Sequence, residues 1–166
     1  MKKILFLLTV VLAFASCEPK FEKEYSWAYP VAGDWLIKVY DLADGAQVTD
    51  PFEMRAYNPS FGTDSIWFDD YASEAGYGNH PVMYGLKFKV AANMSAKTFQ
   101  TTDYVNSLSY YGPAGAAHGA MSLTITNGKI VGNDSIYMEI KFSDDDVTYI
   151  YAGHRETGYD EYMKKF

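Results

Sequence analysis

Short runs in which apolar and polar residues alternate recur along most of the chain. The clearest run spans residues 85–90, where leucine, phenylalanine and valine alternate with two lysines. A period of two indicates a β-strand with one buried face, because successive side chains of a strand point to opposite sides. The same alternation predicts seven further strands, at residues 34–40, 52–57, 64–70, 97–105, 120–126, 134–142 and 147–153.

Turn-forming residues separate these runs and limit how the strands connect. The segments "NPSFG" (58–62), "NG" (127–128), "GND" (132–134) and "SDDD" (143–146) carry the Gly, Pro, Asn and Asp that favour turns. Short connections join antiparallel neighbours, so we expect an all-β fold: an eight-stranded antiparallel up-and-down barrel. Closing the sheet also removes its exposed edges. The alternative is a two-sheet sandwich, whose crossovers need longer links.

One face of the predicted strands is almost wholly apolar. Inside a barrel this face either packs as a solid core or lines a site for one small apolar ligand, and both occur in barrels of eight strands. Methionine and phenylalanine are adaptable linings for such a ligand. The residues expected to line the interior are Ile37, Val39, Phe52, Met54, Phe68, Leu86, Phe88, Leu123, Ile125, Met138 and Ile140.

The N-terminus has the pattern of an export signal. Two lysines precede the apolar run 4–15, which is shorter than a membrane-spanning helix needs, and small residues then precede Cys17. Cys17 is the only cysteine, and its setting resembles the site at which bacterial lipoproteins are acylated. We therefore expect a signal peptide at 1–16, a lipid-anchored flexible tether at 17–26 and a barrel domain at 27–166. The expected location is the outer membrane, on its periplasmic or outer side.

The charge of the chain limits its partners. The formal net charge is −7 at pH 7. An acidic surface disfavours nucleic acid and anionic membrane surfaces as partners. The expected partners are a lipid or small hydrophobic ligand and the membrane reached through the N-terminal anchor, whereas the oligomeric state stays open.

No catalytic or metal-binding motif is evident. The chain lacks G-x-S-x-G, and its three histidines, at positions 80, 118 and 154, show no short ligand spacing. No cofactor and no metal are therefore expected. His118 and His154 are kept as candidates for the rim of the barrel.

Adjacent or nearby carboxylates are the remaining chemical candidates. Asp69 with Asp70, and Glu156 with Asp160, are pairs of the kind used in glycoside hydrolysis. Acidic residues at strand ends are usually solvated, and we expect the same of these four.

Two features resemble the lipocalin and calycin proteins. Gly33 and Trp35 form G-x-W at the start of the first predicted strand, and Arg155 follows the last. In that family the arginine packs over the tryptophan and closes one end of the barrel. The resemblance implies the same structural role for Trp35 and Arg155.

A closer resemblance covers nearly all of the chain after Cys17. The sequence "WAYPVAGDWLIKVY", followed by "DSIWFDD", "GLKFKV", "NGKI", "DSIYMEIKFSDDD" and "YIYAGHRETGY", is similar to the family of Bacteroidetes lipoproteins described as "lipid-binding putative hydrolases". The resemblance implies a lipocalin-like barrel and a lipid or other apolar ligand. It supplies no set of catalytic residues that could be placed on this chain.

We therefore expect a membrane-anchored protein that binds a lipid or another small hydrophobic ligand. A hydrolase with an active site at the rim is one alternative. A filled-core module that contacts protein or glycan through some of its 15 tyrosines is another. A membrane-spanning barrel is disfavoured, because strands of six or seven residues are shorter than the roughly 9–11 that spanning requires.

Overall fold

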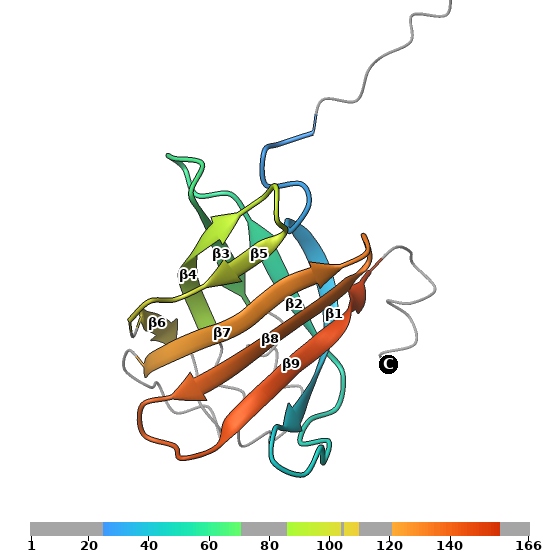
Figure 1. Cartoon of the computed structure of the whole chain (residues 1–166), viewed down its shortest axis with the longest axis vertical. Helices are drawn as coiled ribbons and strands as arrows, with labels where there is room; N and C mark the ends of the chain where they lie inside the picture. Colours follow the sequence, from blue (N-terminus) through green and yellow to red (C-terminus); the bar gives the residue numbers. More distant parts are fainter. Residues whose placement is uncertain (1–24, 71–85, 104, 110–120, 157–166) are drawn as a thin grey trace, which may run out of the picture.

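The computed structural model describes residues 25–70, 86–103, 105–109 and 121–156, and these form one antiparallel sheet of nine strands (Figure 1). The strands are β1 (Gly33–Asp41), β2 (Phe52–Tyr57), β3 (Ser65–Asp69), β4 (Leu86–Asn93), β5 (Thr98–Gln100), β6 (Val105–Ser109), β7 (Met121–Val131), β8 (Ser135–Phe142) and β9 (Thr148–Arg155).

The sheet closes into a barrel with eight positions around its wall. β5 and β6 together occupy one position, because each pairs with β4 on one side and β7 on the other. β1 then pairs with β9 over seven residue positions, from Trp35 opposite Arg155 to Asp41 opposite Tyr149. When β5 and β6 are counted as one position, all other neighbouring positions are consecutive in the chain. The predicted eight-stranded antiparallel up-and-down barrel is confirmed.

The predicted strand 97–105 is divided in two. Thr101, which follows β5, keeps the chain paired with β7: its N–H donates to the carbonyl of Ile125 (3.0 Å), and its hydroxyl accepts from the N–H of Ile125 (2.9 Å). A threonine side chain thus replaces one backbone partner where β5 ends.

The prediction of a turn at Asn127 and Gly128 was wrong. These residues lie inside β7 as a bulge, and the register with β8 shifts between Thr126 and Lys129. Asn127 has φ of 52°, and its side-chain amide donates to both carboxylate oxygens of Glu139 at 2.9 Å. Asparagine and glycine satisfy the backbone demands of a bulge as well as those of a turn. The chain reverses at "GND" instead, over residues 132–134.

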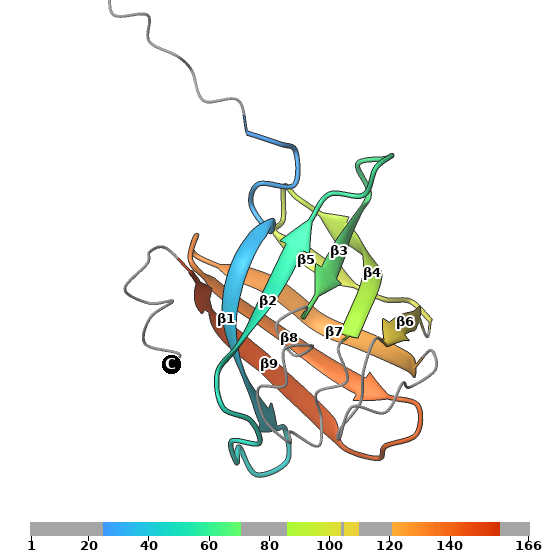
Figure 2. The ribbon, with the colours of Figure 1, turned by 180° about the vertical axis from the view of Figure 1, so that it is seen from behind.

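The two ends of the barrel differ. We call one the closed end: it carries the segment 25–32 and the short connections 58–64, 94–97 and 132–134. We use the name open end only as a label for the other end, where the described residues are the loops 42–51 and 143–147 and the starts of β4 and β7. Figures 1 and 2 show the N-terminal segment and the β2–β3 connection together at the closed end.

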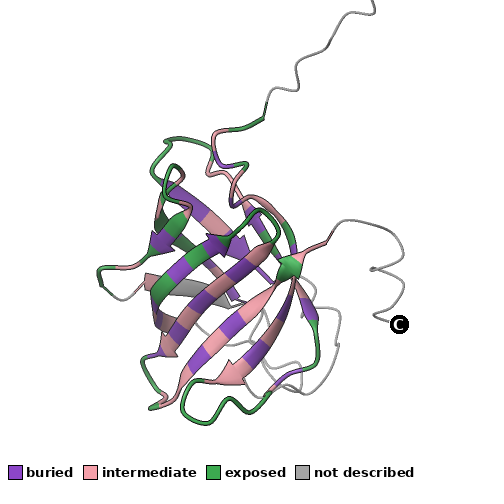
Figure 3. Cartoon of the chain, turned by 45° about the vertical axis from the view of Figure 1, so that its right-hand side comes forward, coloured by how far each residue is buried: buried purple, intermediate pink, exposed green. Residues whose placement is uncertain are grey.

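The apolar face of the strands points inward. Burial alternates along the strands, as the bands in Figure 3 show. All 11 residues expected to line the interior are buried, and they belong to one hydrophobic cluster. Among the described residues, no helix has the length and apolar character that a membrane span requires.

The bulge in β7 yields a test of the packing. A methyl group on Gly128 would strike the carbonyl and the ring of Phe99, which lies opposite it in β5. We expect Gly128→Ala to lower the free energy of unfolding by about 2 kcal/mol, because the buried site cannot accept added volume. Urea denaturation measures the change. Gln100→Ala, at the exposed neighbour of Phe99, serves as the control and should alter stability by less than about 0.5 kcal/mol. Equal effects of the two substitutions would contradict the packing argument.

Candidate functional site

The interior of the barrel is the candidate site, and its closed end is sealed by Trp35 and Arg155. Trp35 is fully buried, and its indole N–H donates to the carbonyl of Val31 at 3.0 Å. The guanidinium carbon of Arg155 lies 4.3 Å from the centroid of the Trp35 ring. This stacking places a cation over the negative face of the indole.

The same guanidinium donates hydrogen bonds to backbone carbonyl oxygens of two segments. Arg155 donates through Nη2 to Pro30 (3.2 Å), through Nη1 to Ala32, and through Nε to Asn133 (3.4 Å). Burial lowers the pKa of Arg155 from its ordinary value, but arginine keeps its charge at neutral pH. One side chain therefore ties the segment 25–32 and the β7–β8 turn across the end of the barrel.

Glycine at position 33 is required by this seal. Gly33 has φ of 140°, and a Cβ there would collide with Nη1 of Arg155. The G-x-W pattern thus has a steric cause in this chain: the glycine leaves room for the arginine that covers the tryptophan.

The interior also holds polar groups that the sequence analysis missed. Asp70 and Thr49 are buried, as are Tyr149 and Tyr151 on the inner face of β9. The hydroxyl of Thr49 accepts from the N–H of Val39 at 3.1 Å. Asp70 continues the inward alternation of Ile66 and Phe68, so the same period-two rule could have placed it inside. These groups lie toward the open end, except Tyr151, which is deeper.

The expectation that Asp69 and Asp70 are solvated was wrong. Asp69 is 8% exposed and Asp70 is fully buried. Asp69 points outward, where its Oδ2 accepts from the hydroxyl of Tyr57 (3.0 Å) and pairs with Nζ of Lys87 (3.3 Å). Adjacent residues of a strand face opposite sides, so the two carboxyls do not form a catalytic pair.

The histidine and carboxylate candidates do not assemble into a site within the described residues. His154 is exposed on the outer face of β9, near the closed end. Glu156 follows β9 at the same end, whereas His118 and Asp160 lie outside the described residues. In the described part of the chain, no three residues among His, Cys, Asp and Glu are placed to hold a metal ion.

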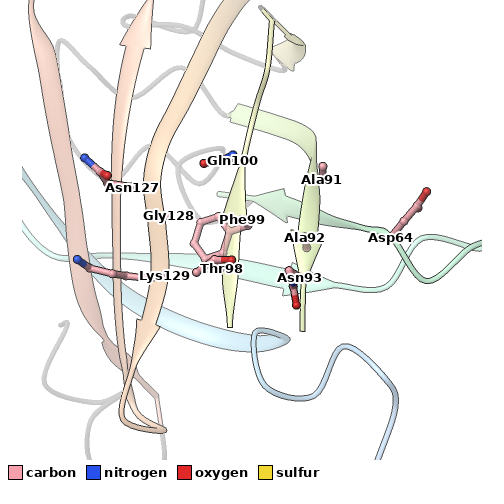
Figure 4. A pocket seen from close by; sticks show the side chains of 10 residues that line it. All are labelled: Asp64, Ala91, Ala92, Asn93, Thr98, Phe99, Gln100, Asn127, Gly128 and Lys129. Atoms are coloured by element: carbon pink, nitrogen blue, oxygen red, sulfur yellow. The ribbon is translucent and has the colours of Figure 1, made fainter. Parts of the chain in front are cut away.

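A separate pocket of about 520 Å³ lies where β4, β5 and β7 meet near the bulge (Figure 4). Polar and apolar atoms contribute equally to its lining, which includes the side chains of Asn93, Thr98, Gln100 and Lys129. Phe99 contributes a ring that belongs to the core. A half-polar lining of this kind suits a lipid less well than the apolar interior does.

The stability of the seal is testable through Arg155. Arg155→Ala removes the stacking on Trp35 and leaves the carbonyls of Pro30 and Ala32 without this donor. We expect it to lower the free energy of unfolding by about 3 kcal/mol. Arg155→Lys keeps the charge but loses the planar fork, so its loss should be intermediate. Lys89→Ala, at an exposed cation, is the control. Urea denaturation measures the free energy of unfolding of each variant. Equal values for Arg155→Ala and Lys89→Ala would contradict the role of the seal.

The open end has a testable dependence on pH. The N–H of Val147 (2.9 Å) and the hydroxyl of Tyr149 (2.7 Å) donate to Asp145 and hold the pKa of that carboxyl below its ordinary value. A lowered pKa stabilises the fold at neutral pH, and this contribution is lost as the pH falls through the lowered value. We expect Asp145→Asn to lose less stability than the wild type between about pH 6 and pH 3. The control Ser143→Asn, at an exposed position of the same loop that carries no titratable group, should follow the wild type. An Asp145→Asn curve parallel to that of the wild type would contradict this assignment.

A comparison with protein families agrees with this geometry. The family model described as "Lipid-binding putative hydrolase" matches residues 20–160. A comparison with curated proteins finds no match.

Proposed function

The chain belongs to the family described as "Lipid-binding putative hydrolase", and from this premise we propose that it holds an acyl chain or a similar small apolar molecule inside the barrel. The observation that carries the proposal is the apolar character of the inner face: the 11 predicted lining residues belong to one hydrophobic cluster inside a barrel whose one end is sealed by Arg155. Apolar surface transferred from water to such a face gains about 25 cal/mol per Å².

The difference between the ends gives the ligand a direction. The seal of Trp35 and Arg155 blocks the closed end, so entry is expected at the open end. The polar groups of Thr49, Asp70 and Tyr149 lie toward that entrance. An apolar tail would point toward the seal, and a polar head would meet hydroxyl and carboxyl groups near the mouth.

Binding and transfer fit the described chemistry better than hydrolysis does. Among the described residues, the inner face supplies mainly hydrophobic contacts, with two tyrosines and single polar groups. We propose acylation of Cys17 as the anchor and the outer membrane as the location. On this view the protein sequesters a lipid or hands it on.

A filled barrel is the second candidate, and one observation favours it. The ring of Phe68 lies 5.6 Å from that of Phe88 and 4.9 Å from that of Phe99, measured between centroids. These contacts occupy part of the interior with side chains. If such packing extends through the barrel, the function moves to the surface, as in a module that contacts protein or glycan.

A larger side chain in the interior distinguishes the ligand-binding barrel from the filled barrel. Met138 points inward from β8, and its neighbour Tyr137 points outward. We expect Met138→Trp to weaken the binding of a fluorescent fatty acid about tenfold, which corresponds to 1.4 kcal/mol, because the indole takes space from the ligand. The matched control Tyr137→Trp should leave the affinity unchanged. Titration of the chain from residue 18 onward gives both values, and native mass spectrometry identifies any lipid that copurifies.

The melting temperature of each variant shows whether it folds, and Met138→Phe is the milder substitution if the indole prevents folding. A wild-type protein that copurifies without lipid and takes up no fatty acid would contradict the binding proposal. Equal affinities of the Met138 and Tyr137 variants would place the ligand outside the barrel.

A further inference from the structure

Exposed apolar side chains gather at the closed end. Among the described residues, the large hydrophobic side chains that are exposed are Tyr25 (56%), Tyr29 (50%), Leu42 (44%), Phe61 (90%) and Val131 (53%). All but Leu42 lie at the closed end, in the segment 25–32, in the β2–β3 connection and at the end of β7. A phenylalanine that is nine-tenths exposed at the tip of a connection gains nothing from the core.

The aromatic residues are held in place. The rings of Tyr25 and Tyr29 lie 3.9 Å apart between centroids, and Arg155 lies 5.9 Å from the ring of Tyr29. The hydroxyl of Ser26 donates to Oδ1 of Asn58 at 3.3 Å, which ties the N-terminal segment to the connection that carries Phe61. Figures 1 and 2 show these two segments at the same end from both sides.

The described loops at the two ends of the barrel differ in charge. In the loops 42–51 and 143–147 at the open end, every charged residue is acidic: Asp44, Asp50, Asp144, Asp145 and Asp146. The segment 25–32 carries no charged residue. In the closed-end connections 58–64, 94–97 and 132–134, two acidic residues, Asp64 and Asp134, stand beside Lys97, which donates to the carbonyl of Gly132 at 2.7 Å. Among the described loops, those of the open end therefore carry more negative charge than those of the closed end.

The closed end is also where the chain leads toward its proposed anchor. Seven residues separate Cys17 from Tyr25, and the eight steps from one Cα to the next reach at most about 28 Å when fully extended. A tether this short keeps the closed end near any surface to which Cys17 is attached. The local concentration is then high, so a few weak contacts suffice to orient the domain.

We propose that the closed end rests on the lipid surface, with Tyr25, Tyr29 and Phe61 in the headgroup region and the open end facing away. This inference rests on the proposed anchoring through Cys17. Tyrosine favours the boundary between water and lipid, and phenylalanine gains by entering it. Anionic lipids repel the acidic loops of the open end, which reinforces the same orientation.

The test compares the two ends in the acylated full chain. Phe61→Cys and Leu42→Cys are each labelled with an environment-sensitive fluorophore, since acylated Cys17 does not react with the label. The proteins are reconstituted in vesicles of phosphatidylethanolamine and phosphatidylglycerol at about three to one, a composition with the anionic surface considered above. Some of the lipids carry a quencher near the headgroup. The label at position 61 is expected to shift its emission to shorter wavelength and to be quenched, whereas the label at position 42 is not.

Substitutions at the neighbouring tyrosines provide the matched comparison. In the protein labelled at position 61, Tyr25→Ser with Tyr29→Ser should reduce quenching, and Leu42→Ser should leave it unchanged. Equal quenching at positions 61 and 42, or stronger quenching at 42, overturns the proposed orientation. Burial of the label in native membranes alone, and not in these vesicles, also overturns it, because the partner would then be a protein.

Two further measurements test the anchoring through Cys17 separately from the orientation. The mass of the N-terminal peptide shows whether Cys17 carries acyl chains, and sedimentation with vesicles shows whether the chain is attached. A chain without acyl groups overturns both the anchoring and the orientation that rests on it. A chain that is acylated and attached but equally quenched at the two ends overturns the orientation alone. Neither result affects the fatty-acid titration that tests the barrel interior.

Discussion

The pairing of β1 with β9 is the constraint on which the rest of the structure depends. It joins the first strand to the last and turns an open sheet into a barrel. Without it, two strand edges and one side of the apolar face would meet water. Arg155 stands at the end of this seam, where it covers Trp35 and donates to carbonyls of the segments that precede β1 and β8. One residue thus couples the long-range closure of the sheet to the sealing of its interior.

Much of this arrangement follows from local sequence patterns. Alternation in "GLKFKV" and "DSIYMEIKF" fixed both the strands and the face that each turns inward, because a strand has only two faces. The inward position of Asp70 follows from the same rule, yet the expectation that acidic residues are solvated took precedence over it. The bulge at Asn127 and Gly128 was misread for another reason. Asparagine readily adopts the left-handed conformation that both a turn and this bulge use at position 127. Only the partner strands, with Phe99 opposite the glycine and Glu139 beside the asparagine, select the bulge.

The site is less predictable than the fold, since its properties depend on which end of the barrel a residue reaches. Sequence order shows that His154 follows an apolar strand, but not that it lies outside the wall near the sealed end. Likewise, Tyr149 and Tyr151 appear in the sequence as members of a tyrosine-rich run. The closed sheet turns both inward, and the Asp145 carboxylate beside the open end holds the hydroxyl of Tyr149.

The polarity of the barrel connects the proposed binding to the proposed membrane contact. On the proposed route, an acyl chain that enters the barrel leaves a bilayer or a carrier and passes the open end. If the sealed end faces the lipid surface, that entrance opens toward the solvent and toward whatever brings or receives the ligand. The acidic loops around the entrance then point away from the anionic lipid, and they remain in water, where their charges are solvated. A protein arranged in this way is suited to exchange with a soluble partner rather than to extraction from the membrane beneath it. The seal of Trp35 and Arg155 serves this arrangement twice, because it ends the apolar interior on one side and supports the aromatic surface on the other.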